Sequence, residues 1–312
     1  MPPTHHLPKI LCIVGPTASG KTALAIRTAQ ALNGEILSAD SRQIYKLLTI
    51  GTAKPSPEEL KAVPHHFIDI LLPDEHFSAG DFSEQGRKVI ADVLSRGKFP
   101  IIAGGTGLYV EALVDGLFEG PAIQHELRAD LEERMRTEGG ASMLEELRKV
   151  DPAAAARMLP TNTRRIIRAL EVYYATGIPL TEHHNRQVRE QRYHPVFVGL
   201  EWDRKALYER INRRVDRMIE EGFLDEVKAV RAAGYDERYK SLQTVGYKEA
   251  FAYLRGELTY ERMVELMKQN TRRFAKRQLT WFRYDERIRW FSVASDDDVR
   301  KAAERAVGLL RG

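Results

Sequence analysis

An α/β fold with a parallel sheet is predicted by three short apolar segments that alternate with helical patterns in the first 116 residues. The segments cover residues 10–14, 35–39 and 99–103, and small or polar residues follow each of them. This alternation is typical of a parallel sheet with helices on both faces. Beyond residue 116 the pattern is helical only, until a strand-like segment returns at 195–200. We therefore expect an α/β core with a helical insertion domain and a helical C-terminal region.

The length of the chain agrees with a core that carries an insertion. Its 312 residues, 43% of them hydrophobic, suffice for a substantial core but exceed one small domain. We place the catalytic core and its C-terminal helices at residues 1–118 and 195–312, and the helical insertion at 119–194.

Charge and cysteine content exclude several classes of protein. The net charge of +4 is too small to identify a partner. Cys12 is the only cysteine, which excludes an internal disulfide and a cysteine zinc site. The chain has no apolar segment of about eighteen residues, so we expect no role in a membrane. We expect a cytoplasmic protein and, without any sign of obligate assembly, a monomer.

The octapeptide GPTASGKT at residues 15–22 follows the first predicted strand and precedes a helix-like segment. Its spacing fits G-x-x-x-x-G-K-[ST], the phosphate-binding loop of P-loop NTPase-like folds. Backbone N–H groups can surround an anion here, the lysine adds a positive charge, and the last hydroxyl can bind Mg²⁺. The predicted diphosphate-binding residues are Gly15, Pro16, Thr17, Ala18, Ser19, Gly20, Lys21 and Thr22, with Thr22 as the metal ligand. The motif accepts any diphosphate ester and does not identify the rest of the ligand.

Asp40 stands at the carboxyl end of the second predicted strand. It can act as a Mg²⁺ ligand or as a general base, and it can also simply begin a turn. Asp69 is a rival for the metal role. Ser41, Arg42 and Gln43 follow Asp40. They favour a functional role for this segment, because the amide of Gln43 is suited to a bidentate grip on adenine.

Thr106 follows the third predicted strand, where it is either a hydroxyl of the site or a plain helix N-cap. Ligands of parallel α/β sheets bind beyond the carboxyl ends of the strands. We therefore expect residues 15–22, 40–43 and 104–106 to converge on one crevice.

Basic residues gather in two places. The first group, which contains no acidic residue, is Lys268, Arg272, Arg273, Lys276, Arg277 and Arg283, and the second, in the insertion, is Arg157, Arg164, Arg165 and Arg168. Aromatic residues at 274, 281 and 282 are interleaved with the first group. Such clusters are often solvated helix faces, but two of them beside a diphosphate site favour RNA. His65 and His66 lack a partner at metal-ligand spacing, and we expect them to be structural or surface residues.

Seven motifs together resemble a known family. They are GPTASGKT, ADSRQIYK, GTAKP at 51–55, GGTGLY, RRIIRALE at 164–171, QTVGYKE at 243–249 and RRFAKRQLTWFR at 272–283. In this order, from about Ile10 to Trp290, the chain resembles the bacterial tRNA dimethylallyltransferases, also called tRNA isopentenyltransferases. It departs from the family pattern at 119–125, where the family more often has a connection that contains Pro and Asp.

The resemblance implies a prenyl transfer reaction. The phosphate-binding loop would hold the diphosphate of dimethylallyl diphosphate, which leaves while the five-carbon group moves to N6 of the adenosine 3′ of a tRNA anticodon. Lys21, Arg214 and Mg²⁺ on Thr22 would stabilise the negative charge that builds on the leaving group. By the same resemblance, Asp40 is the base that accepts the N6 proton, and Thr106 lies near the reacting centre.

The resemblance also implies contacts with the anticodon stem-loop of tRNA, from which the adenosine is flipped out. The implied tRNA-binding residues are Asp40, Ser41, Arg42, Gln43, Arg164, Arg165, Arg168, Gln243, Thr244, Val245, Gly246, Tyr247, Lys248, Arg273, Lys276 and Arg277. On this interpretation the helical insertion serves tRNA binding.

Three other functions are compatible with parts of the sequence. A P-loop small-molecule kinase would share Lys21 and Thr22 and a basic helical lid, and it would need ATP. An isopentenyltransferase that acts on free adenine nucleotides would share the catalytic core. A non-enzymatic ATP-binding RNA protein is the least favoured, because it leaves Asp40, Gln43 and Thr106 without a role.

Overall fold

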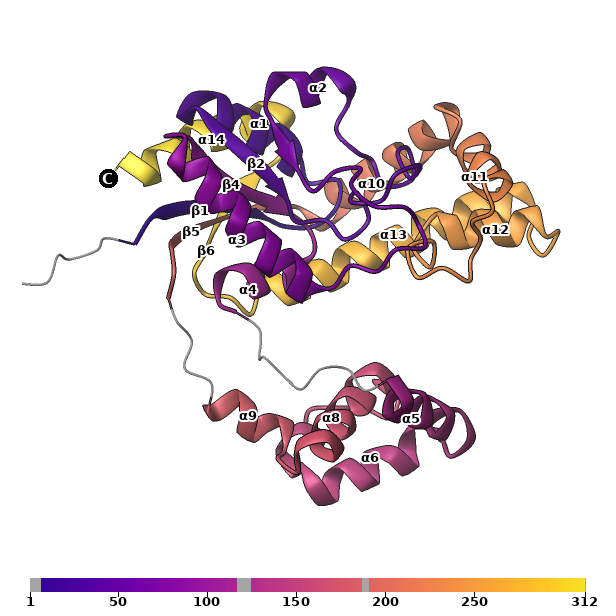
Figure 1. Cartoon of the computed structure of the whole chain (residues 1–312). Helices are drawn as coiled ribbons and strands as arrows, with labels where there is room; N and C mark the ends of the chain where they lie inside the picture. The colour runs from indigo at the N-terminus through magenta and orange to yellow at the C-terminus, as the bar shows by residue number, and fades with distance from the viewer. Residues whose placement is uncertain (1–6, 117–124, 187–190, 312) are drawn as a thin grey trace, which may run out of the picture. The chain divides into compact units, whose positions relative to one another are not determined.

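The chain forms two compact units, the first from the residues up to 115 and from 191 onward, the second from residues 116–190. The computed structural model describes residues 7–116, 125–186 and 191–311. A six-stranded sheet forms the centre of the first unit (Figure 1). Its strands are β1 (Lys9–Val14), β2 (Gly34–Ser38), β3 (His65–His66), β4 (Phe99–Gly104), β5 (His194–Trp202) and β6 (Ile288–Val293), in the order β3-β2-β4-β1-β5-β6. Neighbouring strands are parallel, which confirms the predicted α/β sheet.

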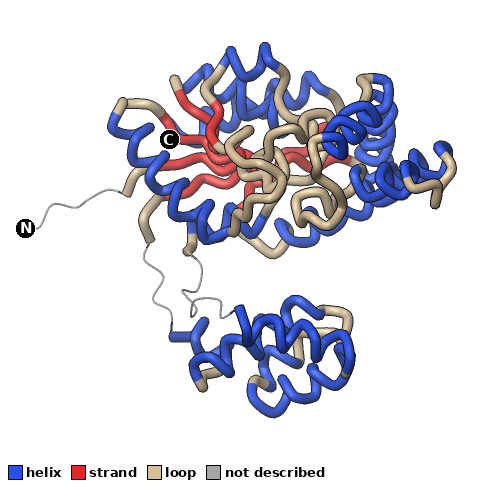
Figure 2. Tube along the Cα trace, turned by 45° about the vertical axis from the view of Figure 1, so that its right-hand side comes forward, coloured by secondary structure: helices blue, strands red, loops and turns tan. Residues whose placement is uncertain are grey.

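Continuous apolar sequence explains the burial of the central strands. In β1 every residue after Lys9 is buried, and β2 is buried along its whole length. Strands that are covered on both faces need near-continuous apolar runs rather than alternation. Figure 2 shows these strands surrounded by helices.

Helices cover both faces of the sheet. Those of the first unit are α1 (Lys21–Leu32), α2 (Pro57–Ala62), α3 (Ala79–Ser95), α4 (Gly107–Val114), α10 (Arg204–Glu220), α11 (Phe223–Ala232), α12 (Tyr247–Leu254), α13 (Tyr260–Phe282) and α14 (Asp296–Arg311). Leu11 and Ile13 of β1 share a core with residues of α1 and α14. The alternate residues of the strand point to the opposite face, on which α3 and α4 lie (Figure 1). The long helix α13 packs on α10, α12 and α4.

Two of the strands contradict the sequence prediction. β6 lies where we predicted only helices up to the C-terminus. β3, which has only two residues, was not predicted as a strand. β6 is an edge strand in which the buried Ile288, Phe291 and Val293 are separated by more exposed residues. It therefore lacks the continuous apolar run by which the central strands are found. β3 is too short to produce a sequence pattern.

The second unit consists of helices, as predicted for the insertion. They are α5 (His125–Thr137), α6 (Gly139–Val150), α7 (Pro152–Ala155), α8 (Thr163–Thr176) and α9 (Leu180–Arg186). Their shared core includes Leu131, Met143, Leu147, Ile166 and Leu170. The expected limit at 118/119 and most of the atypical connection at 119–125 lie outside the described residues. None of the helices within the described ranges is long and apolar enough to cross a bilayer.

A buried carboxylate joins β2 to its surroundings near the amino end of the strand. Glu35 is 4% exposed, accepts a hydrogen bond from Nη2 of Arg96 (2.8 Å), and hydrogen-bonds to Nε2 of His66 (2.9 Å). These bonds, chiefly those from Arg96, lower the pKa of Glu35 to about 2. His66 is thus structural, one of the two roles we expected for it.

We predict that Glu35 contributes stability that acid removes. Because its pKa is lower in the folded protein, the contribution is complete above the ordinary value of 4.5 and is lost as the pH falls toward about 2. Glu35→Gln should lower the free energy of unfolding at neutral pH by about 1–3 kcal/mol. It should also flatten the pH dependence of stability in the acid range. Urea denaturation at a series of pH values measures both effects, and an unchanged acid profile in the variant would contradict the prediction.

Candidate active site

A cavity of about 540 Å³ opens at the carboxyl ends of β1, β2 and β4. Three segments with predicted roles line it: Thr17, Lys21 and Thr22 of the loop after β1, residues 40–43 after β2, and residues 103–106 at the end of β4. Residues 51–53, the segment 243–246 and side chains of α10, α12 and α13 form the rest of the wall. The parallel topology thus brings together the three loops as expected.

The loop between β1 and α1 depends on glycine for its conformation. Gly15 has a φ of 141° and Gly20 a φ of 93°, which residues with a Cβ rarely adopt. Gly20 directly precedes α1, so the loop leads into the positive end of the helix dipole and the N–H groups of its first turn. Ser19 is fully buried and is not part of the cavity lining, so its hydroxyl does not face the cavity.

Two residues that the sequence analysis missed hold this loop from outside the cavity. Nε1 of Trp202 donates to the carbonyl oxygen of Ser19 (2.9 Å), and Nε of Arg210 donates to that of Ala18 (3.0 Å). The guanidinium of Arg210 stacks on the Trp202 ring, 4.2 Å from its centroid. Neither side chain lines the cavity. The carbonyl groups are therefore bound on the outer side, which keeps them from facing an anion. The only sequence signal is that Arg210 lies one helical turn before Arg214.

Two half-buried cations stand beside the loop and line the cavity. Nζ of Lys21 donates to the carbonyl oxygen of Pro16 (2.5 Å), and Nη1 of Arg214 donates to Oγ1 of Thr17 (3.4 Å). Burial, and then the charge of Arg214, lower the pKa of Lys21 to about 7, while Asp40 opposes the shift. Burial also lowers the pKa of Arg214. Two desolvated positive charges in one cavity favour the entry of an anion.

Asp40 begins a turn, one of the alternatives from the sequence, and also lines the cavity. Its Oδ1 accepts hydrogen bonds from the N–H groups of Arg42 (2.8 Å) and Gln43 (3.3 Å). The turn fixes the direction of the carboxylate and uses Oδ1 alone. A turn-forming and a catalytic role are therefore compatible in this residue.

Thr106 connects the loops after β2 and β4. It occupies the N-cap position of α4, but its side chain makes no capping hydrogen bond. Instead its Oγ1 accepts the N–H of Ser41 (3.0 Å) and lies 3.4 Å from the Ser41 hydroxyl. The plain N-cap interpretation does not hold, because the hydroxyl points to the neighbouring loop.

Gln278 of α13 joins two of the loops and was not predicted. Its Oε1 accepts the N–H of Thr17 (2.8 Å), and its Nε2 donates to the carbonyl oxygen of Gly105 (2.9 Å). A Cβ on Gly105 would lie 2.2 Å from that nitrogen, so glycine is needed there. Gln278 is buried, and its membership of the RRFAKRQLTWFR motif was its only signal in the sequence.

Comparison with known proteins identifies the family. The family model described as IPP transferase matches residues 43–285, which is most of the chain. The chain belongs to the IPP transferase family. It is 50% identical to tRNA dimethylallyltransferase 1 of Pelobacter propionicus over 285 residues, 91% of this chain and 92% of that protein. It is 47% identical to the tRNA dimethylallyltransferase of Geobacter sulfurreducens over 93% of this chain and 94% of the relative.

Solved structures agree with this assignment. The tRNA isopentenylpyrophosphate transferase of Bacillus halodurans superposes with a TM-score of 0.71 at 42% identity and covers 97% of each chain. A eukaryotic dimethylallyltransferase acting on tRNA superposes with a TM-score of 0.83 at 29% identity, over 96% of this chain and 78% of its own. The P-loop-like parallel sheet is therefore shared with both of these structures.

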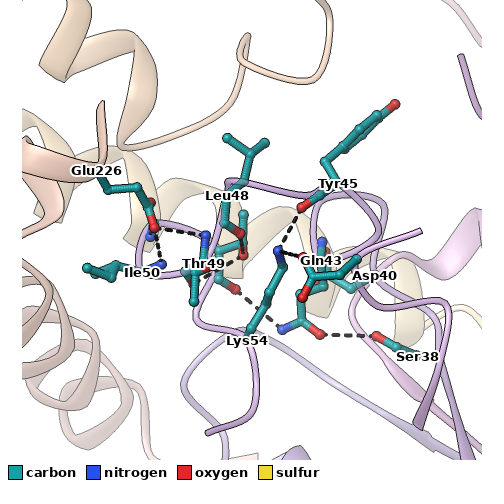
Figure 3. A network of polar contacts seen from close by, with 12 residues as sticks. Ser38, Asp40, Gln43, Tyr45, Leu48, Thr49, Ile50, Lys54 and Glu226 are labelled. Carbon is teal, nitrogen blue, oxygen red and sulfur yellow. Dashed lines mark hydrogen bonds and ion pairs between the residues drawn. The ribbon is translucent and has the colours of Figure 1, made fainter. Parts of the chain in front are cut away.

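Two residues that we assigned to tRNA have other partners in this member of the family. Gln43 lines the cavity, but its Nε2 donates to the carbonyl oxygens of Thr52 and Ala53, and its Oε1 accepts from the Ser38 hydroxyl (Figure 3). The predicted bidentate grip on adenine is wrong for this conformation, because both ends of the amide are bound. Tyr247 is fully buried, so a direct tRNA contact by its side chain is also wrong.

The other predicted tRNA-binding residues of the first unit differ in position. Ser41, Arg42, Gln243, Thr244, Val245, Gly246, Lys248 and Arg277 line the cavity. Arg273 and Lys276 are exposed on α13 but are not part of the lining. Lys268 and Arg283 are paired with Asp216 and Glu201, so the basic cluster of α13 is not uniformly available.

Three of the four basic residues of the insertion group lie on α8, and the exposed Arg157 precedes this helix. Arg164 and Arg165 are exposed, whereas Arg168 pairs with the buried Glu171, which also binds Arg128. Arg168 is therefore needed inside the unit, and Arg164 and Arg165 are the better candidates for an external partner.

The side chains of the cavity fit a metal ion whose ligands come mainly from the phosphates of a bound substrate. Asp69, the rival ligand, pairs with Lys54 and is not part of the cavity lining. Within the described ranges, no group of three or more His, Cys, Asp or Glu side chains could hold a metal ion. Mg²⁺ often binds through one or two protein ligands, waters and substrate phosphates. The Thr22 hydroxyl in the cavity wall suits that mode.

We predict that diphosphate binding takes up a proton above pH 7. The pKa of Lys21 is about 7 in the free protein, so the amine becomes neutral as the pH rises, and an adjacent anion should restore its charge. The affinity for inorganic diphosphate should therefore fall with rising pH, by up to about tenfold per unit. Calorimetry in two buffers of different ionisation enthalpy measures the uptake. Lys21→Gln is the control, because in this variant only ionisation of the diphosphate itself changes the number of bound protons. The variant should take up fewer protons than the wild type, and equal proton uptake in both proteins would contradict the prediction.

Proposed function

We propose that this chain transfers the dimethylallyl group of dimethylallyl diphosphate to N6 of the adenosine 3′ of a tRNA anticodon and releases diphosphate. The observation that carries the proposal is that a phosphate-binding loop with two half-buried cations, Lys21 and Arg214, shares one cavity with the Asp40 carboxylate. Membership of the IPP transferase family and relatives named tRNA dimethylallyltransferase support the choice of donor and acceptor.

The cations suit the leaving group. Breaking the allylic C–O bond leaves its electron pair on the diphosphate, so negative charge grows as the bond ionises. Lys21, Arg214 and the N–H groups of the loop can stabilise that charge with little reorganisation, because they are held in place before the reaction. Mg²⁺, held by Thr22 and the diphosphate, would add positive charge there.

Asp40 suits the acceptor. The lone pair of adenine N6 is delocalised into the ring, which makes the amine a poor nucleophile. A carboxylate that accepts the N6 proton while the new C–N bond forms would overcome this, and Asp40 is already oriented by its turn. Thr106, which lines the cavity beside Ser41, would steady the bridging oxygen or the departing diphosphate.

The remaining polar residues suit the RNA. A base inside a stacked loop cannot reach the strand ends, so the adenosine must be flipped out. We propose that Arg42, Arg277, Lys248 and the segment 243–246 contact the flipped nucleotide or its neighbours, and that Arg273 and Lys276 bind phosphates. The insertion, placed at 119–194 by sequence, would grip the anticodon stem with Arg164 and Arg165. We propose a monomeric cytoplasmic enzyme.

The alternatives are less well supported. A kinase or an enzyme for free adenine nucleotides would use the same loop. However, relatives that match more than nine tenths of this chain are named for action on tRNA.

We predict a five-carbon adduct on adenosine when unmodified tRNA is incubated with this protein, Mg²⁺ and dimethylallyl diphosphate without ATP. Mass spectrometry of the digested nucleosides measures it, and protein omitted from the mixture is the control. Absence of an adduct with folded protein, together with phosphorylation of a small molecule when ATP is supplied, would favour the kinase.

A second prediction concerns the base. Asp40→Asn keeps an oxygen for the turn but removes the proton acceptor, so turnover should fall by about 10²–10⁴-fold. The affinity for tRNA should change by no more than a few fold, because the turn is retained. Single-turnover kinetics and a filter-binding assay measure the two quantities. A large loss of binding with unchanged turnover at saturation would instead assign Asp40 to recognition.

A further inference from the structure

Glu226 of α11 binds three consecutive backbone N–H groups of the segment that follows residue 48. Its Oε2 accepts from Thr49 (2.9 Å) and Ile50 (2.6 Å), and its Oε1 accepts from Gly51 (3.0 Å). Figure 3 shows the carboxylate at one end of this segment and Lys54 at the other. Hydrogen bonds from N–H groups to an ionised carboxylate are among the stronger ones in proteins.

Tyr247, the first residue of α12, also binds this carboxylate. Its hydroxyl donates to Oε1 of Glu226 (2.5 Å), and its ring is fully buried. A Cβ on Gly51 would lie 2.6 Å from that ring and 2.5 Å from the ring of Phe223, so the backbone lies directly against both. Glu226 thus accepts four hydrogen bonds, two on each oxygen of its side chain.

The same segment is attached independently at its other end. Nε2 of Gln43 donates to the carbonyl oxygens of Thr52 (3.3 Å) and Ala53 (3.0 Å). Residues 51–53 line the cavity between the two attachments, whereas Glu226 is not part of the lining. The carboxylate therefore acts on the cavity only through the backbone that it holds.

We propose that Glu226 is a positioning residue for the acceptor RNA. By holding residues 49–51 against Tyr247 of α12, it fixes the separation between the wall that continues at 51–53 and the neighbouring wall at 243–246, and so the width of the cavity beside Asp40. The identity of the acceptor rests on the function proposed above. Glu226 itself touches no reacting atom.

The two ends of the cavity are held by different residues, so this role can be separated from diphosphate binding. Trp202, Arg210 and Gln278 bind residues 17–19 at the diphosphate end. Gly51 is attached instead to Glu226, and Thr52 and Ala53 are attached to Gln43, which belongs to the turn that Asp40 begins. A change at Glu226 should weaken RNA binding and leave diphosphate binding intact.

Glu226→Gln is the sharpest test, because it keeps the size of the side chain and replaces one acceptor oxygen with a donor. The loss of two hydrogen bonds should raise the KM for an anticodon stem-loop RNA by about tenfold, while kcat and the KM for dimethylallyl diphosphate change by less than about threefold. Hydrogen exchange at the amides of residues 49–51 should become faster by a similar factor. The matched control is Asp225→Asn, at an exposed neighbour that pairs with Lys228, which should change none of these quantities.

Tyr247→Phe removes one donor and should raise the same KM by about two- to threefold, which keeps the proposal testable if Glu226→Gln does not fold. An unchanged KM for RNA in folded Glu226→Gln, a fall in kcat alone, or an equal rise of KM for both substrates would overturn the positioning role. If the wild-type protein transfers no prenyl group, the proposed function fails instead. The RNA affinities of the wild type and Glu226→Gln, measured by fluorescence anisotropy, then still decide the role of Glu226.

Discussion

The adjacency of β2, β4 and β1 is the constraint on which the site depends. Strands that run in the same direction end at the same edge of the sheet, so loops that are far apart in the sequence lie side by side. At this edge the backbones are so close that a Cβ on Gly104 would lie 2.1 Å from the carbonyl oxygen of Ala39. Thr106 can therefore reach Ser41 with its hydroxyl. The proposed base and the anion site keep their separation because the sheet fixes it.

The diphosphate end of the cavity is distinguished by its two positively charged side chains. Lys21 and Arg214 are cations that burial makes harder to charge, and Asp40 favours the charged form of both. Keeping two such charges out of water opposes folding, and an anion that enters compensates for part of this cost. The compensation increases with the charge of the anion. It is therefore largest when the allylic bond has ionised, which is the differential stabilisation that accelerates a reaction.

The sequence predicted those features that depend on local pattern and failed for those that depend on distant contacts. The central strands were found because burial on both faces requires continuous apolar runs, whereas β6 and the two-residue β3 leave no such run. The phosphate-binding loop was found because its glycines and lysine are spaced within eight residues. Trp202, Gln278 and Glu226 were missed because the loop backbone groups that they bind lie more than 170 residues away. Tyr247 shows the opposite error, since a residue within a family motif serves the interior.

One face of α13 serves the whole length of the cavity. Met267, Thr271, Phe274 and Gln278 line it at intervals of three or four residues, and Trp281 continues the same stripe against Gly107. A helix advances about 100° per residue, so one residue inserted before Gln278 would turn that amide away from Thr17. Proteins that keep these contacts can therefore carry no insertion or deletion of a single residue in α13 between Met267 and Trp281.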